Sequence, residues 1–299
     1  MSDGVRAHVF ASVTVLFWST VATAFKLALQ VLDVFQLILY ATLTAAGILL
    51  MAVMLRGEAG SLLSVLRRHW RVSLVSGALN PFIYYIVLFA AYDRLPAQVA
   101  QPINYTWAIV LTFMSIVVLK QKITGRDIGA AVVCYAGVLI IAVQGQWRTF
   151  SIADPTGVML ALLSTLVWAS YWIINMRDPR PPMIALCLNF LVALPLTAVA
   201  CVIMSTPIVT STNGIAGAVY VGVFEMGLSF LLWSHALRLA ENTSRVSNLV
   251  FLSPFLSLVF INRILGEPIY STTYVGLVII IAGLLLQRMQ RILPESEVV

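Results

Sequence analysis

The apolar residues of the chain fall into long runs separated by short polar segments. Read against a window of about twenty residues, the runs predict ten membrane-spanning helices. Their expected limits are 8–28, 33–54, 72–92, 97–119, 127–145, 156–176, 182–204, 214–237, 246–265 and 270–288. About twenty apolar residues in a helix cross a hydrocarbon core about 30 Å thick. The pattern therefore predicts an all-α membrane protein without a separate soluble domain.

The positive charges predict how these helices are oriented. If the N-terminus is cytoplasmic, the segments on that side hold all but four of the 18 Lys and Arg residues. The four others are Lys26, Arg94, Arg148 and Arg263. Because Lys and Arg gather in cytoplasmic loops, we expect both termini in the cytoplasm. The largest of these segments, 55–71, ends in the run RRHWR, which we interpret as a topology-setting basic loop at the lipid headgroups.

The chain divides into two halves of similar design. Residues 1–150 hold five predicted spans, and residues 151–299 hold five more. Because five is odd, the second half would enter the membrane from the opposite face, as in the inverted repeats of many secondary transporters. Local matches agree with this division: Trp18 corresponds to Trp168 in the first span of each half, and Gly137 corresponds to Gly283 in the last.

The composition agrees with a membrane protein and argues against nucleic acid as a partner. The chain is 61% hydrophobic and 10% charged. A net charge of +6 suggests nucleic acid only where Lys and Arg cover one solvated surface, whereas here they lie in short runs between apolar spans. The first residues, MSDGVRAH, lead into a long span without a small-residue cleavage site, so we expect the first helix to be retained.

The sequence gives no sign of a cofactor, a metal or an enzymatic reaction. Cys134, Cys187 and Cys201 lie in apolar spans without paired spacing, as expected of small packing residues. Glycine-rich phosphate loops, HExxH and GxSxG are absent from the sequence. We therefore expect a protein that is not an enzyme and that needs no cofactor.

The fourth span carries the first candidate for a solute-lining surface. Its first part contains the polar and aromatic residues Gln98, Gln101, Asn104, Tyr105 and Trp107. In a membrane such groups are satisfied only by neighbouring helices or by a wet cavity. Asn104 and Tyr105 are therefore candidate solute contacts, and Trp107 is a candidate cavity wall.

Further aromatic candidates lie inside other spans. Tyr84 and Tyr85 follow Asn80-Pro81, where proline loosens the helix. The remaining candidates are the tryptophans in the middle of spans one, six and eight, namely Trp18, Trp168 and Trp233. An indole N–H buried at that depth needs a partner. The alternatives are interfacial tyrosines at a kink and tryptophans that pack helix against helix.

Glu225 is the one carboxylate clearly within a predicted span. Because a charge at that depth is costly, Glu225 is interpreted either as a group that binds a substrate ammonium or carries a proton, or as a structural hydrogen-bonding residue. Ser229 and Trp233 follow at helical spacing and share its face. Asn248 is a further polar candidate, in span nine.

Three sequence elements resemble a known group of transporters. They are Trp18-Ser19 with its counterpart Trp168-Ala169, the segment PINYTW at 102–107, and a span-nine pattern that ends in Gly266-Glu267-Pro268. Together they resemble the drug/metabolite transporter superfamily in its EamA-like branch, over essentially the whole chain. The segment PINYTW resembles the INYLWP element of aromatic amino acid exporters. Ala108 stands where that element has proline, and Gln121 stands where the family often has glutamate.

The resemblance implies two inverted five-helix repeats in a bacterial inner membrane. It also implies a central cavity walled by spans one, three, four, six, eight and nine. We therefore expect a secondary transporter that exports small amphipathic solutes, above all aromatic and large neutral amino acids, by alternating access. Another metabolite, a nucleobase or a hydrophobic drug fits a cavity of rings with few charges as well. A membrane-embedded enzyme or a structural subunit is the alternative from a different class.

Overall fold

The computed structural model describes residues 2–119, 124–149, 151–152, 154–240, 246 and 249–289. Within these residues all regular secondary structure is helical. The first half forms α1 (Asp3–Leu29), α2 (Val34–Leu55), η1 (Ala59–Ser61), α3 (Leu62–Gly77), η2 (Ala78–Ile83), α4 (Tyr84–Arg94), α5 (Ala97–Asn104), α6 (Trp107–Leu119) and α7 (Gly125–Ala142). The second half forms α8 (Pro155–Asn175), α9 (Pro182–Met204), α10 (Thr212–Val221), η3 (Gly222–Gly227), α11 (Leu228–Leu239), η4 (Leu249–Leu252), α13 (Ser253–Phe260), η5 (Ile261–Leu265) and α14 (Ser271–Met289).

The predicted all-α membrane architecture is confirmed. In the described part of the chain, six helical segments are long and apolar enough to cross a membrane. They are Asp3–Leu29, Val34–Leu55, Ala59–Arg94, Pro155–Asn175, Pro182–Met204 and Thr212–Leu239. The other predicted spans appear as shorter or interrupted apolar helices, which are α5 with α6, α7, η4 to η5, and α14.

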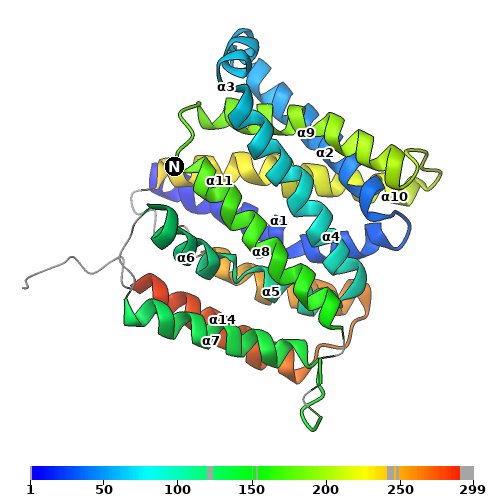
Figure 1. Ribbon diagram of the computed structural model, residues 1–299, viewed down its shortest axis with the longest axis vertical. Coiled ribbons are helices and arrows are strands. Elements are labelled where there is room, and N and C mark those ends of the chain that lie inside the picture. Colours follow the sequence, from blue (N-terminus) through cyan, green and yellow to red (C-terminus); the bar gives the residue numbers. More distant parts are fainter. Residues whose placement is uncertain are drawn as a thin grey trace, which may run out of the picture.

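The third predicted span begins earlier than the hydropathy pattern indicated. Within the expected loop 55–71, residues 62–71 belong to α3, whose backbone kinks at His69 (φ −124°, ψ 30°) before it leads through η2 into α4. A hydropathy window ends the span at the basic run 67–71, whereas the backbone before and after His69 is helical. Trp70 remains 53% exposed, and the ring of Trp70 lies under the guanidinium of Arg71 at 5.4 Å. α3 extends past its neighbours at the top of the molecule (Figure 1).

Several helices begin at side-chain caps that the sequence supplies. Asp33 accepts from the backbone N–H groups of Phe35 and Gln36 at the start of α2. Asp154 accepts from the N–H of Gly157 at the start of α8. That bond, together with Arg94, holds the pKa of the Asp154 carboxyl below its ordinary value. Such caps satisfy the free N–H groups of a first turn and fix where the helix starts.

The helices pack in reciprocal pairs. α2 packs against α9 at one end of the molecule, and α7 packs against α14 at the other (Figure 1). Between these pairs, α1 contacts α11 and α13 of the second half, while α8 contacts α4 and α6 of the first half. Each first-half helix thus meets a helix of the second half, and the same relationship recurs with the halves exchanged.

Small residues bring α7 and α14 into close contact. A Cβ added at Gly137 would lie 2.7 Å from the carbonyl oxygen of Gly276, and one at Gly283 would lie 2.5 Å from Sγ of Cys134. The thiol of Cys134 donates to the carbonyl of Ile280 at 3.3 Å. Such spacing leaves no room for a side chain at either glycine and is the typical way in which membrane helices approach closely.

Candidate functional site

Two spans are interrupted near their middle by π-helical turns. The first, η2, contains Asn80 and Pro81 and leads into Tyr84 and Tyr85 at the start of α4. Proline lacks a backbone N–H and crowds the preceding turn, so regular helix bonding is lost there. The second, η3, contains Glu225. π-Turns of this kind often lie at functional sites, and both are located at the depth where the sequence predicted solute contacts.

The indole of Trp168 lies at the centre of an aromatic cluster. Its ring centroid is 4.5 Å from that of Tyr84, 6.3 Å from Trp107, 5.6 Å from Tyr171, 6.0 Å from Trp172 and 6.2 Å from Phe230. We name these six residues the Trp168 cluster. Each ring pair of this kind contributes about 0.5–1.5 kcal/mol beyond the area that it buries. The cluster joins α4 and α6 of the first half to α8 and α11 of the second.

Hydrogen bonds run alongside the cluster and also join the two halves. The hydroxyl of Tyr84 donates to Oδ1 of Asn104 at 3.3 Å, and Nδ2 of Asn104 donates to Oγ of Ser164 at 2.9 Å. The hydroxyl of Tyr85 donates to Oε1 of Glu225 at 3.1 Å. All five side chains lie near the middle of their spans, so this part of the membrane interior contains donors, acceptors and rings together.

The break between α5 and α6 directs span four toward α8. Asn104 ends α5 and reaches Ser164, while Trp107 begins α6 and packs against Trp172, with ring planes at 14° and centroids 6.4 Å apart. Tyr105 lies in the break next to α13. The predicted neighbours Asn104, Tyr105 and Trp107 are thus distributed over two contacts, with α8 and with α13.

Trp18 and Trp233 form a separate pair. Their ring centroids are 5.2 Å apart, between α1 and α11. Among the described residues, no ring contact joins this pair to the Trp168 cluster. The two indoles therefore form a second aromatic group, between the first span of one half and the third span of the other.

Two polar candidates remain, Ser229 and Asn248. Ser229 is fully buried, and its hydroxyl donates to the carbonyl oxygen of Phe224 across η3. This bond satisfies a carbonyl that the π-turn leaves without its regular helical partner. Asn248 lies outside the described residues.

The structure brings into the site several residues that the sequence did not single out. Tyr171 and Trp172 follow Trp168 by three and four positions, so they share its helix face. That spacing was the available signal. The indole nitrogen of Trp172 is buried and makes no hydrogen bond within the described part of the chain. Ser164 precedes Trp168 by four positions on the same face and receives the bond from Asn104.

A separate cleft of about 580 Å³ opens on the side of the molecule between α6, α7 and α8. It is lined by Val110, Phe113, Met114, Val117, Val118, Ala131, Tyr135 and Leu166. Val117 is 80% exposed at its rim. A lining this apolar suits lipid chains better than a polar solute, so the Trp168 cluster with its hydrogen bonds remains the candidate site.

The side chains of this site are suited to the non-covalent binding of a solute. Within the described residues, no group of three or more His, Cys, Asp and Glu side chains could hold a metal ion. Glu225 supplies a carboxylate, Asn104 supplies an amide, and the rings supply apolar and cation-binding faces. These groups can hold an amphipathic molecule by its polar end and its side chain at once.

Comparison with known sequences gives a consistent result. The sequence profile of the EamA-like transporter family matches residues 5–143 and again residues 155–289. An uncharacterized transporter of Archaeoglobus fulgidus is 23% identical over 287 residues, which cover 94% of this chain and 96% of that protein. An uncharacterized transporter of Clostridium kluyveri is 25% identical and covers 93% of this chain and 91% of its own. Protein PecM of Dickeya dadantii is 25% identical over 79% of this chain and 82% of its own length.

A solved crystal structure has the same fold. It superposes with a TM-score of 0.68 at 19% identity and covers 95% of this chain and 98% of its own. At this identity the likeness concerns the fold alone.

Proposed function

Because the chain belongs to the EamA-like transporter family, we propose that it is a secondary transporter that exports small amphipathic solutes by alternating access. Its proposed substrates are amino acids, above all aromatic and large neutral ones. The observation that carries the proposal is the meeting of rings and hydrogen-bonding groups from both halves around Trp168, near the middle of their spans. A site between two halves near the midplane is what a transporter of this design requires.

The proposed architecture is a pair of inverted five-helix repeats divided near residue 150. The reciprocal packing of α1 with α11 and α13, and of α8 with α4 and α6, supports it. So do the π-turns η2 and η3, which interrupt the third span of each half. Rocking of one repeat against the other would open the site to each side in turn.

In the proposed complex the solute lies between the halves. Its apolar side chain packs against Trp107, Trp168 and Tyr84 or Tyr85, with Trp18 and Trp233 as a further wall. Its amino and carboxylate groups are held by polar side chains from three spans, namely Asn104, Tyr105, Glu225, Ser229 and Asn248. The Tyr85–Glu225 bond supports the role of Glu225 as the ammonium partner, because a carboxylate is the natural acceptor for an ammonium group.

We propose the bacterial inner membrane as the location, with both termini in the cytoplasm. The helices of the described part, long and apolar, support a membrane location. The excess of Lys and Arg in the segments on one side supports the orientation. The proposed partners are the solute and the surrounding lipid; nucleic acid is not among them.

Counterflow in proteoliposomes tests this proposal. Vesicles containing purified protein are loaded with unlabelled phenylalanine, and the entry of labelled phenylalanine is followed. Phenethylamine and 3-phenylpropionate, which keep the ring but lack the carboxylate and the amine respectively, are then added outside as competitors. We expect exchange of phenylalanine, with stronger competition from the amine than from the acid because Glu225 faces the ammonium end.

The variant Trp107→Ala is measured in parallel, with Trp70→Ala as its matched control. Trp70 is 53% exposed on α3, about four helical turns before Tyr84. We expect exchange to be lost in the first variant and kept in the second. Exchange of a nucleobase or a drug in place of every amino acid would overturn the proposed substrate class, and folded protein without flux of any of these solutes would overturn the exporter itself.

A further inference from the structure

Arg180 is buried at the end of the bundle where α8 connects to α9. Its guanidinium is fully buried, and the carboxylate of Asp178 is 5% exposed. Nε of Arg180 donates to both carboxylate oxygens of Asp178, at 2.9 and 3.0 Å, and Nη2 donates to Oδ2 at 2.5 Å. This is a bidentate ion pair, which fixes the plane of the guanidinium as well as its position.

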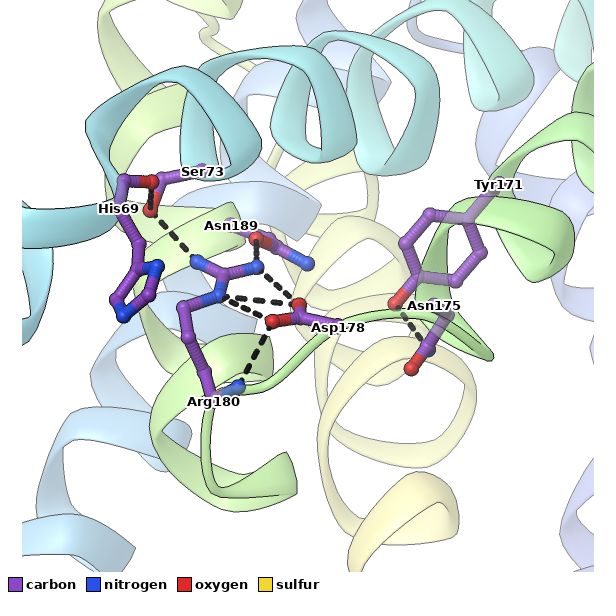
Figure 2. A network of polar contacts seen from close by, with 7 residues as sticks. All are labelled: His69, Ser73, Tyr171, Asn175, Asp178, Arg180 and Asn189. Atoms are coloured by element: carbon purple, nitrogen blue, oxygen red, sulfur yellow. Dashed lines mark hydrogen bonds and ion pairs between the residues drawn. The ribbon is translucent and has the colours of Figure 1, made fainter.

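The remaining donors of Arg180 connect three parts of the chain. Nη1 donates to Oγ of Ser73 in α3 at 2.6 Å, and Nη2 donates to Oδ1 of Asn189 in α9 at 3.0 Å (Figure 2). The hydroxyl of Ser73 in turn donates to the carbonyl of His69 at 3.2 Å. Arg180 thus joins the α8–α9 connection and α9, both in the second half, to α3 in the first.

α3 and α9 approach each other closely beside this network. A Cβ added at Gly77 would lie 2.5 Å from the carbonyl oxygen of Asn189, the residue that accepts from Arg180. Gly77 is followed directly by η2 and then by Tyr84 and Tyr85. Any movement of α3 away from α9 would therefore shift the π-turn that carries these two tyrosines.

The network also lies next to the Trp168 cluster. The hydroxyl of Tyr171 accepts a hydrogen bond from Nδ2 of Asn175 at 3.3 Å and lies close to Asn189. The ring of Tyr171 contacts Trp168 at 5.6 Å between centroids. Tyr171 therefore lies between the buried ion pair and Trp168. Figure 2 shows Tyr171 with Asn175 beside the network of Arg180.

A buried ion pair is an expensive way to hold two helices together. Removing both charges from water offsets most of their attraction, and apolar side chains of similar size often stabilise a fold as well or better. Asp178 and Arg180 both belong to the α8–α9 connection, so they stay paired when α3 moves. The pair holds the guanidinium in the orientation in which Nη1 reaches Ser73 of the other half. Because this charge-assisted bond between the halves is lost when α3 leaves α9, it favours the closed arrangement.

We propose that Asp178 and Arg180 form a latch that closes this end of the transporter and that both act as positioning residues for the site. Closed, the latch holds α3 against α9 and so sets the positions of Tyr84, Tyr85 and Tyr171. Opening of this end requires the bond from Nη1 of Arg180 to Oγ of Ser73 to break. The inference rests on the proposed alternating access, but its test does not depend on the identity of the solute.

The test measures how often this end opens. Ser76 lies in α3 one turn beyond Ser73 and is 1% exposed. Ser76→Cys is introduced into a background in which Cys134, Cys187 and Cys201 are replaced by alanine, and its rate of labelling by a small thiol reagent is measured. Asp178→Leu is then combined with Arg180→Met, which removes both charges without leaving either one buried alone. We expect labelling to become faster by on the order of tenfold, because labelling follows the population of the open form.

Three controls separate a latch from a fold defect. Thr23 is buried in the C-terminal part of α1, and Thr23→Cys should not label faster in the double variant. Arg180→Lys keeps the charge without the planar fork and should give an intermediate labelling rate. The melting temperature of the double variant should stay close to that of the parent.

In exchange assays we expect the double variant to change both the maximal rate and the half-saturating concentration by severalfold, because the closed latch positions Tyr84 and Tyr85. Equal labelling of Ser76→Cys in the parent and the folded double variant would overturn the latch. The absence of flux with every solute, together with faster labelling, would overturn the proposed exporter and leave the latch supported.

Discussion

The hydroxyl of Tyr85 donates a hydrogen bond to Oε1 of Glu225 at 3.1 Å, across 140 positions of the chain. Both residues lie at the π-turn of the third span of their half: Tyr85 just after η2 and Glu225 within η3. Within the described residues, this carboxyl in the middle of a span thus has one hydrogen-bond partner, from the opposite half, and its second oxygen can accept from another donor. A solute with an ammonium group can supply that donor.

We predict that Glu225→Gln weakens solute exchange. A hydrogen bond to a charged group contributes about 1.5–3 kcal/mol, and 1.4 kcal/mol corresponds to a tenfold change in affinity. The half-saturating phenylalanine concentration should therefore rise about tenfold or more. Tyr85→Phe removes the donor from Glu225 and should act in the same direction with a smaller effect. Tyr274→Phe, an exposed position in α14, serves as the control. Unchanged kinetics in Glu225→Gln would leave Glu225 a structural hydrogen-bonding residue.

Much of the helical framework could be predicted from the sequence, because a hydropathy window detects what a bilayer requires of each span. The interruption at Asn80-Pro81 could be predicted as well, since proline cannot continue a regular helix. The contact of Trp107 with Trp168 rests instead on how α6 crosses α8. Crossing angles depend on side-chain packing between distant segments, which hydropathy does not contain.

Arg180 shows most clearly what could not be predicted from the sequence alone. From the sequence it counts as one of the basic residues that set topology, and its charge is consistent with that interpretation. The structure buries its guanidinium between α3 and α9. Nothing in the local sequence distinguishes it from the exposed Arg177, because its partners Ser73 and Asn189 lie in other helices. The basic run at 67–71 was likewise assigned to a loop, since charge alone does not indicate whether a helix continues.

We predict opposite effects of two glycine substitutions within α7. Gly137→Ala should lower the melting temperature, because the added Cβ would lie 2.7 Å from the backbone oxygen of Gly276 and 2.8 Å from a side-chain carbon of Ile280. Gly129→Ala has open space within 4 Å and should leave stability unchanged or raise it by about 0.5–1 kcal/mol, the helical preference for alanine. Thermal unfolding of both variants in the same detergent checks this pair. A lower melting temperature in both would show that helix α7 tolerates no alanine for reasons other than close contact with α14.

We predict that the α2–α3 and α9–α10 connections lie on opposite sides of the membrane. Gly60→Cys and Thr210→Cys place exposed thiols in these two connections, while the native cysteines Cys134, Cys187 and Cys201 are buried. In intact bacterial cells a membrane-impermeant maleimide should label Thr210→Cys and spare Gly60→Cys, which should react only after permeabilisation. Labelling in the reverse order would place the termini outside.

We predict that acid weakens the fold partly through Asp178. Burial by itself raises the pKa of this carboxyl, but hydrogen bonds from the side chain and backbone N–H of Arg180, with the charges of Arg180 and His69, outweigh it. The pKa in the folded protein is therefore lowered. A group of this kind stabilises the fold fully above its unfolded pKa of about 4 and loses that contribution as the pH falls through the lower folded value.

Melting temperatures from pH 6 to pH 3 check this prediction in the wild type and in the double variant with Asp178→Leu and Arg180→Met. The wild type should lose more stability below pH about 4, because protonated Asp178 leaves the buried guanidinium of Arg180 without its counter-ion. Removing one partner of a buried pair is destabilising by about 3–5 kcal/mol, which sets the largest difference to expect between the two curves. The double variant has no charge to lose at this place and should follow a flatter curve. Asp154→Asn, at the partly buried start of α8, controls for the acid response of other carboxylates. Parallel curves for wild type and double variant would mean that the ion pair does not contribute to stability.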